Sequence, residues 1–147
     1  MASFLANTNI GVMQKAFYQF ATTDGGAGNY FHLKTNIVKS GLQMFYIEAD
    51  GYAYGNGTPI LCAWTGYPYN GTDTLINIGL SNLYAGMEAH GAYQSSDGYV
   101  CLRAYTTGPY YCGFVLNSVM ANPAGWGYNF KVSITAASQN TNSGNYY

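Results

Sequence analysis

The amino-acid sequence predicts an all-β protein, an antiparallel β-sandwich or jelly roll of about eight strands. From residue 29 onward, segments of about ten residues alternate apolar with polar side chains, and clusters of Gly, Pro, Asn or Asp bound each segment. A helical pattern occurs in only one short segment, residues 12–21. A chain of 147 residues can form one domain that buries roughly 70% of its unfolded surface, so it needs no covalent staples.

The composition predicts a surface that is polar but almost uncharged. Charged residues make up 7% of the chain, against roughly 25% in soluble domains, while tyrosine and glycine number 16 and 19. The exposed faces are therefore expected to carry Tyr, Asn, Ser and Thr, which suits contact surfaces. Because so little charge protects poorly against association, we expect an oligomer or a component of a larger assembly.

The same composition argues against nucleic-acid binding, membrane insertion and disulfide bonding. A net charge of −1 offers no basic stripe to phosphate backbones. No stretch approaches 18 uninterrupted apolar residues, and the start of the chain lacks the regions of a secretory signal. Three cysteines, an odd number, fit a chain made in a reducing cytoplasm.

The beginning of the chain is expected to be an arm separate from the sandwich. Residues 12–21 fit a short helix, although their aromatic residues fit a strand equally well, and a glycine-rich break follows them. Chain ends are ordered only where they are tied down, so we expect the arm to dock on a neighbouring chain or on the edge of its own domain. The expected boundaries are 1–28 for the arm, 29–137 for the sandwich and 138–147 for a polar tail.

The clearest strand is residues 43–54, where within residues 45–50 apolar residues at odd positions alternate with Tyr and acidic residues at even positions. A turn cluster from Gly55 to Pro59 connects it to the next run, so the two form a hairpin or a corner between sheets. The expected strands are residues 30–38, 43–54, 60–69, 74–80, 86–94, 99–106, 110–119 and 128–136.

Residues 99–119 are expected to form the best hairpin, because turn residues punctuate the chain at 95–98 and 107–109. Its inward-facing residues are core candidates: Val100, Leu102, Ala104, Cys112, Phe114 and Leu116. In a tight hairpin Cys101 would lie almost opposite Cys112, where the geometry allows a disulfide, but buried thiols are the expectation for a cytoplasmic product. In the tail, Tyr146 and Tyr147 are available to pack on a partner.

Few residues suggest catalysis or metal binding. Glu48 and Asp50 lie two apart on one strand and so project from the same face, whereas the paired carboxylates of glycosidases face each other across a substrate. We therefore expect a solvated strand face, or a contact to Lys34 or Arg103. His32, and His90 with Glu88, lack any nucleophile signature, and the cysteine spacings are not those of zinc sites. No cofactor and no metal are expected.

Aromatic residues in or beside the turns are the strongest candidates for a functional role. They include two copies of a Gly-Tyr-x-Tyr element, at residues 51–54 and 66–69. Aromatic residues in turns are exposed more often than those in strands, and they can bind a neighbouring protein surface, stack on sugar rings or plug the ends of the sandwich. Protein contact is the favoured interpretation. The candidate binding residues are Tyr52, Tyr54, Trp64, Tyr67, Tyr69, Trp126 and Tyr128.

Three runs resemble β-sandwich modules of bacteriophage virion surface proteins, particularly of phages of cyanobacteria. They are 30–37 (YFHLKTNI), 44–47 (MFYI) and 51–60 (GYAYGNGTPI), with a looser likeness at 96–100 (SDGYV), so the resemblance covers roughly residues 29–136. It implies a homotrimer of jelly-roll-like domains without a catalytic signature. The chain has no collagen-like stalk or heptad shaft, which favours a small separate protein over a whole fibre.

Composition and resemblance together predict a structural component of a phage virion, made in the host cytoplasm. We expect a trimeric surface decoration, cement or short head-fibre knob protein that binds other copies of itself and other capsid or tail proteins. The alternative is a tail-fibre receptor-binding module that recognises host surface glycan. Glycan binding that is lost on Trp64→Ala or Trp126→Ala would favour the receptor module.

Overall fold

The structure, a computed structural model, is an antiparallel β-sandwich with nine strands in the part of the chain that it describes. That part comprises residues 14–21, 28–39, 44–54, 57–69, 74–107, 111–121, 132–140 and 143–147. The strands are β1 (Gln14–Ala21), β2 (Gly28–Val38), β3 (Met44–Tyr54), β4 (Thr58–Tyr69), β5 (Thr74–Ala85), β6 (Glu88–Gln94), β7 (Tyr99–Thr107), β8 (Tyr111–Ala121) and β9 (Ile134–Asn140).

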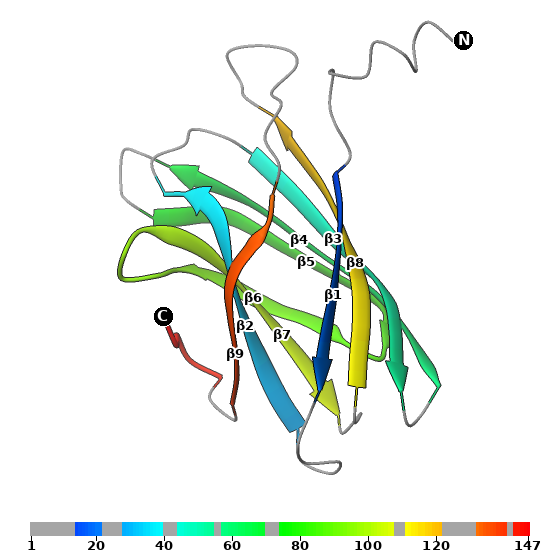
Figure 1. Cartoon of the computed structure of the whole chain (residues 1–147). Helices are drawn as coiled ribbons and strands as arrows, with labels where there is room; N and C mark the ends of the chain where they lie inside the picture. Colours follow the sequence, from blue (N-terminus) through cyan, green and yellow to red (C-terminus); the bar gives the residue numbers. More distant parts are fainter. Residues whose placement is uncertain are drawn as a thin grey trace, which may run out of the picture.

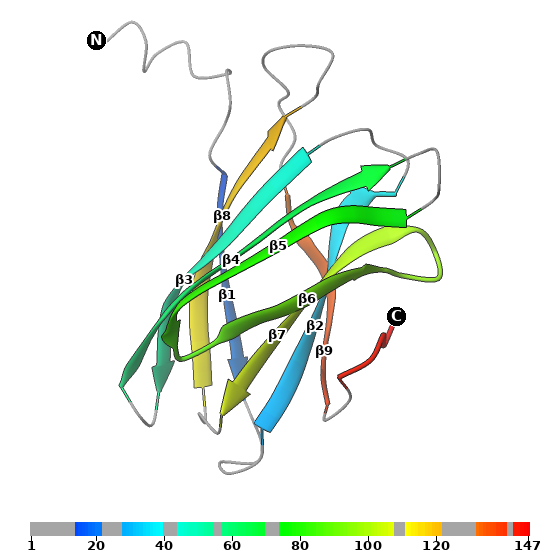
Figure 2. The same cartoon turned by 180° about the vertical axis from the view of Figure 1, so that it is seen from behind.

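The strands form two sheets that face each other (Figures 1 and 2). The five-stranded sheet has the order β1-β8-β3-β4-β5, and the four-stranded sheet has the order β6-β7-β2-β9. β1 pairs with β8 in one sheet while β2 pairs with β7 in the other, which is the nested winding of a jelly roll; β3, β4 and β5 form a plain meander. The predicted fold class is therefore confirmed.

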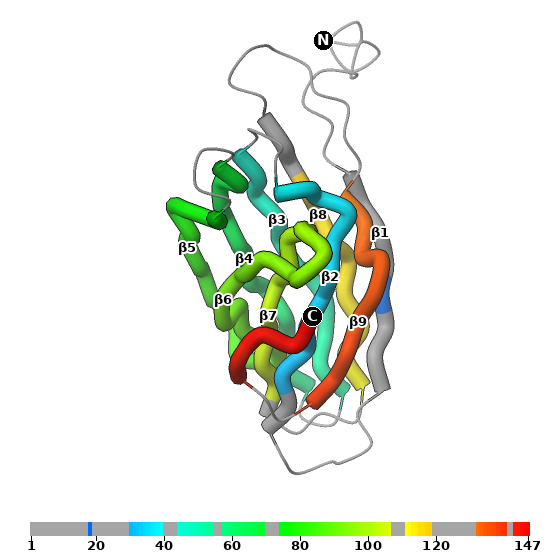
Figure 3. Tube along the Cα trace, turned by 90° about the vertical axis from the view of Figure 1, so that its left-hand side faces the viewer, coloured from blue at the N-terminus to red at the C-terminus, as the bar shows by residue number. Residues whose placement is uncertain are grey.

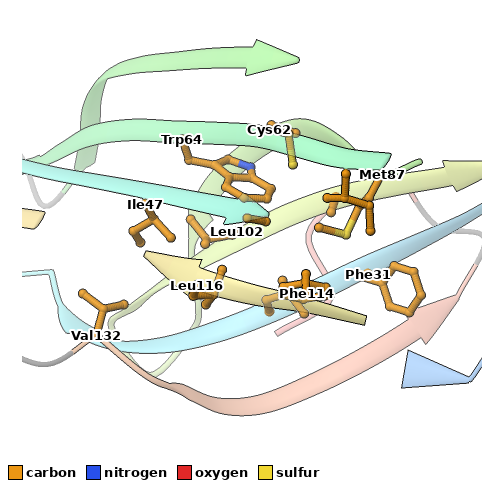
Figure 4. Close-up of a cluster of buried hydrophobic side chains, with 14 of the residues drawn as sticks. Phe31, Ile47, Cys62, Trp64, Met87, Leu102, Phe114, Leu116 and Val132 are labelled. Atoms are coloured by element: carbon orange, nitrogen blue, oxygen red, sulfur yellow. The ribbon is translucent and has the colours of Figure 1, made fainter. Parts of the chain in front are cut away.

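The core lies between the sheets and takes alternate residues from each strand. In β3 the odd positions Phe45, Ile47 and Ala49 are buried and the even positions face outward. Figure 4 shows side chains from both sheets meeting in this core, among them Trp64 and Phe114 of the five-stranded sheet and Phe31 and Leu102 of the four-stranded sheet. The predicted core residues are each at most 1% exposed: Val100, Leu102, Ala104, Cys112, Phe114 and Leu116.

The segment for which a helix or a strand was expected is strand β1. It pairs with β8 along its whole length, from Gln14 opposite Ser118 to Ala21 opposite Tyr111. The helix interpretation is wrong, because pairing along a sheet outweighs the weak helix preference of so short a segment. β1 docks on the edge of its own domain, while residues 1–13 and 22–27 lie outside the described residues.

The expected hairpin at residues 99–119 is not formed. β7 lies between β6 and β2 in the four-stranded sheet, whereas β8 lies between β1 and β3 in the other sheet. Alternation shows which side of a strand is apolar but not which sheet the strand joins, and here the chain crosses the sandwich between β7 and β8. Cys101 and Cys112 are thus in different sheets, and both are free, buried thiols, as expected.

Two of the predicted turn clusters do form tight connections between strands. The first joins β3 to β4 as a hairpin, with Gly57 at a φ of 63°. The second joins β6 to β7 through residues 95–98. There the Tyr99 N–H donates to Ser95 Oγ at 2.8 Å, Gly98 has a φ of 84°, and Asp97 forms an ion pair with Lys34 of β2. Gly98 suits this turn because a positive φ costs glycine little.

An Asp97→Asn variant is expected to change the pH dependence of stability. The Lys34 hydrogen bond, followed by that from Ser95, lowers the pKa of Asp97 from 3.8, and the same pairing raises the pKa of Lys34 from 10.5. A lowered carboxyl pKa stabilises the fold above pH 3.8 and a raised amine pKa stabilises it below pH 10.5, so both contribute between these values. The melting temperatures of parent and variant should differ by a small, constant amount between about pH 5 and 9 and converge as the pH falls through the lowered pKa. A gap that persists in acid would contradict this.

The end of the chain differs from the expectation. β9 spans Ile134–Asn140 rather than residues 128–136, so the expected tail begins inside a strand. The polar composition of residues 138–140 suits an edge strand, because its outer side meets solvent. Residues 122–131 and 141–142 lie outside the described residues. Segment 143–147 packs on the outer face of its own four-stranded sheet (Figure 3).

Candidate functional site

The outer face of the five-stranded sheet carries a set of exposed tyrosines. The even positions of β3 face outward, and the strand register places outward-facing residues of β4, β5 and β8 beside them. We call this surface the tyrosine face. Six of its tyrosines are 38–60% exposed: Tyr46, Tyr52, Tyr54, Tyr69, Tyr84 and Tyr111.

The rings of the tyrosine face are ordered by contacts with one another and with the sheet. The ring centroids of Tyr54 and Tyr111 lie 5.8 Å apart on paired strands, and those of Tyr67 and Tyr69 lie 5.9 Å apart. The ring of Tyr52 lies over Gly113 of β8, where an added Cβ would be 2.9 Å from Tyr52 Cζ. Rings that are held in place lose little entropy when a partner covers them.

Two carboxylates lie between the tyrosines on β3. Glu48 accepts hydrogen bonds from Tyr46 Oη at 2.6 Å and from Asn117 Nδ2 at 3.3 Å, while Asp50 is exposed. The hydrogen bond to Glu48, aided by burial, raises the pKa of Tyr46 to about 12. As expected, the two acids project from one face. The expected contact to Lys34 or Arg103 is wrong, because Lys34 pairs with Asp97 and Arg103 donates to the His90 carbonyl, both in the other sheet.

The prediction that Trp64 is a binding residue is wrong. The even positions of β4 face inward, so Trp64 is 0% exposed and lies in the core (Figure 4). Its Nε1 donates to the Arg103 carbonyl of the opposite sheet at 3.2 Å. Nearness to a glycine-rich turn suggested exposure, but the position of Trp64 within its strand decides its burial.

The structure brings together four of the other candidates and adds three more. Tyr52, Tyr54 and Tyr69 are exposed on the tyrosine face, and Tyr67 lies half-buried beside Tyr69. Trp126 and Tyr128 lie outside the described residues. Tyr46, Tyr84 and Tyr111 were not among the residues predicted from the sequence. The alternation in residues 44–54 contained the signal for Tyr46, because it places this residue on the same side as Tyr52 and Tyr54.

The histidines pack against tyrosine rings, and the cysteines are buried. His32 is fully buried with Nδ1 3.0 Å from Tyr93 Oη, and the ring of His90 packs against those of Tyr30 and Tyr105 at 5.3 and 5.7 Å. Burial raises the pKa of the thiols, to about 12 for Cys62 and Cys112 and about 11 for Cys101. Among the described residues, no three His, Cys, Asp or Glu side chains gather as metal ligands. No described helix has the length and apolar character to cross a bilayer.

The side chains of the tyrosine face are suited to binding another molecule rather than to catalysis. Each phenol supplies a rigid apolar ring and one hydrogen-bonding tip, so a row of them can bury area and still satisfy polar groups on a partner. Comparisons of the chain with protein-family models, with curated proteins and with solved structures return no match.

Proposed function

We propose that the protein is a structural component of a bacteriophage virion: a surface decoration, cement or short head-fibre knob protein that acts by binding protein. In this proposal the tyrosine face is the contact between copies in a homotrimer. The observation that carries it is the set of six tyrosines, each 38–60% exposed, on one sheet face. The virion and the trimer rest on the sequence resemblance, and the tyrosine face supplies the surface through which such an assembly would form.

Three physical features favour protein contact at this face. Monomeric proteins seldom expose large contiguous apolar patches, and the centres of protein interfaces are rich in Tyr and poor in charge. Among the described side chains of the tyrosine face, only Glu48 and Asp50 are acidic and none is basic. Glu48 already accepts two hydrogen bonds, so covering it costs less than covering a fully hydrated carboxylate.

The neighbouring edge of the sheet supports contact between copies. β5 is an edge strand, and apolar residues stay exposed along it: Ile78 is 43%, Leu80 47% and Leu83 64% exposed. Exposed apolar edges invite aggregation unless something covers them. When the edge of one copy meets the face of the next, the contact is heterologous, and such contacts form a ring, for example a trimer, when the rotation between copies closes.

A Tyr54→Ser, Tyr84→Ser double variant is expected to weaken assembly by about 100-fold or more, because each buried tyrosine anchor contributes about 1–2 kcal/mol. Multi-angle light scattering should give a trimer for the parent and a monomer for the variant at the same micromolar concentration. Circular dichroism and melting temperature should stay near those of the parent, because both side chains are exposed, at 60% and 46%.

The matched control is Val38→Ser, which removes a side chain that is 43% exposed at the end of β2 in the other sheet. This variant should assemble like the parent. A parent that stays monomeric across micromolar concentrations would count against the proposal, as would a double variant that assembles with parental affinity.

Receptor binding is the second candidate, because exposed Asp50 lies beside Tyr52 on one strand. A sugar ring can stack on a phenol while its hydroxyls donate to a carboxylate. Saturable binding of host polysaccharide that is lost in Tyr52→Ala would favour this function. Trp64→Ala cannot serve as that test, because Trp64 lies in the core.

A further inference from the structure

Three side chains on the outer face of the four-stranded sheet are buried although they point away from the core. His32 and Cys101 are 0% exposed and Tyr93 is 8% exposed. Strand register places them on one side of the sheet, opposite core residues such as Leu33 and Leu102. The outer face of a two-layer sandwich normally meets water. Other parts of the chain must therefore cover this area.

Segment 143–147 lies across this area (Figure 3). Tyr93 Oη accepts the backbone N–H of Tyr146 at 3.2 Å and that of Tyr147 at 3.5 Å. The ring centroid of Tyr146 is 5.6 Å from that of His32, and Lys34 Nζ is 5.6 Å from the ring centroid of Tyr147. The sheet thus contacts both the backbone and the rings of two consecutive tyrosines.

The Tyr93 hydroxyl is the centre of the polar contacts. A hydroxyl oxygen has two lone pairs and one proton. The two backbone N–H groups donate to the oxygen, and His32 Nδ1 lies 3.0 Å from it. The contact with buried His32 holds the hydroxyl where its oxygen can accept from a peptide backbone.

Residues of the site also contact one another, independently of the segment. Lys34 forms an ion pair with Asp97 and lies 5.3 Å from the ring centroid of Tyr99, so its ammonium group is fixed from two sides. His32 and Tyr93 come from β2 and β6 and bond directly across β7. Sites that are ordered before binding lose less entropy when the ligand arrives.

We propose that His32, Tyr93 and Lys34 form a binding site for an extended Tyr-Tyr segment, which the chain fills with its own Tyr146 and Tyr147 and which accepts the same segment from a second copy. We call it the Tyr-Tyr site. Residues 143–145, which precede the two tyrosines, are exposed, and the ring contacts of the segment with His32 and Lys34 come from Tyr146 and Tyr147. A neighbouring copy offers an identical segment and therefore identical contacts. Exchange of the segment can thus join two copies at little cost in free energy. The site is independent of the tyrosine face.

The first test empties the site and refills it with a peptide. A chain ending at residue 142 is titrated with the peptide Ser-Gly-Asn-Tyr-Tyr, and backbone amide shifts in β6 and β2 are followed by NMR. Saturable binding with a dissociation constant of about 1 mM is expected, as is an approximately tenfold loss of affinity in Tyr93→Phe, which removes the acceptor oxygen. The peptide Ser-Gly-Asn-Ala-Ala should not bind. Absence of saturable binding by the folded, shortened chain would overturn the proposal.

The second test measures exchange between chains. The donor is the full chain with Tyr93→Phe, whose own site is weakened, and the acceptor is the chain ending at residue 142. Both carry Tyr54→Ser and Tyr84→Ser, so association through the tyrosine face cannot produce the signal. With each chain at about 1 mM, near the expected dissociation constant, light scattering should show a complex, and the complex should be lost when the acceptor also carries Tyr93→Phe. Peptide binding without such a complex would overturn the exchange between copies.

Should the shortened chain fail to fold, the full-length Tyr146→Ser, Tyr147→Ser variant replaces it as acceptor in both tests. This variant keeps the backbone of the segment but lacks both rings, so its own segment competes weakly for the site. The same saturable binding and the same Tyr93 dependence are expected.

Discussion

A Gly51→Ala variant is expected to lose roughly 3 kcal/mol or more of folding free energy, which corresponds to a fall of about 10 °C in melting temperature. A Cβ at this position would lie 2.0 Å from the Gly113 carbonyl oxygen and 2.6 Å from Phe114 Cα. Both atoms belong to the backbone of β8, so no side chain can move aside. The variant can fold only if β3 and β8 separate, which breaks ladder hydrogen bonds in the middle of the sheet.

Gly113→Ala is the matched control, because Gly113 lies on β8 next to the residue paired with Gly51 but faces the opposite side. Its added Cβ would meet the ring tip of Tyr52, which is 48% exposed and can rotate outward. We expect a loss of less than about 1 kcal/mol by chemical denaturation. Equal losses in the two variants would show that β3 and β8 are not as close as the structure has them.

A Trp64→Ala variant is expected to lose about 3–5 kcal/mol of folding free energy, because the indole is 0% exposed in the core and its removal leaves a cavity. It also removes the donor for the Arg103 carbonyl. The measurement is equilibrium unfolding in urea, with the slope m compared between parent and variant to confirm that both unfold in one step.

Tyr54→Ala separates the structural role of Trp64 from a binding role. Tyr54 is 60% exposed on the tyrosine face, so its loss should change stability by less than about 0.5 kcal/mol and should affect assembly instead. If Trp64→Ala kept parental stability while Tyr54→Ala unfolded the protein, the assignment of the inner and outer faces of the five-stranded sheet would be reversed.

The sequence predicted the strands well because alternation is local information. Within residues 44–54 each apolar residue at an odd position is buried, and the turn residues near Gly57 and Gly98 do reverse the chain. Eight expected strands correspond to β2–β9, although β5 is longer than expected and β9 lies closer to the end of the chain. Alternation of side chains and turn chemistry were sufficient for this part of the fold.

Alternation and turn residues could not predict which strands pair with one another. β7 and β8 are close in sequence but belong to different sheets, and β1 pairs with β8 at the far end of the chain. These choices depend on which edges remain open once other strands have paired, and no local pattern encodes that. The same limit applies to the Tyr-Tyr site, because contacts of Tyr93 with His32 and Tyr146 join residues that lie 61 and 53 positions apart.

The tyrosine face was predicted in part. Residue type and the nearby turns selected Tyr52, Tyr54, Tyr67 and Tyr69, which the sheet places on one face. Trp64 was predicted to lie on this face because it is near a turn. Its even position in the strand, which places it on the inner side, was not taken into account. Ile60 and Cys62 already marked the inner side of that strand, and Trp64 shares their parity.

The claim that the tyrosine face binds neighbouring copies is tested most directly by hydroxyl-radical footprinting. Tyr146 is an internal reference, because it is 52% exposed on the other sheet, close to the 48% of Tyr52 and the 46% of Tyr111. In the assembled parent, Tyr52 and Tyr111 should be oxidised several-fold more slowly than Tyr146, and the three rates should become similar in the Tyr54→Ser, Tyr84→Ser variant. Equal rates in the parent at concentrations where it is assembled would contradict the account, since the tyrosine face would then be open to water.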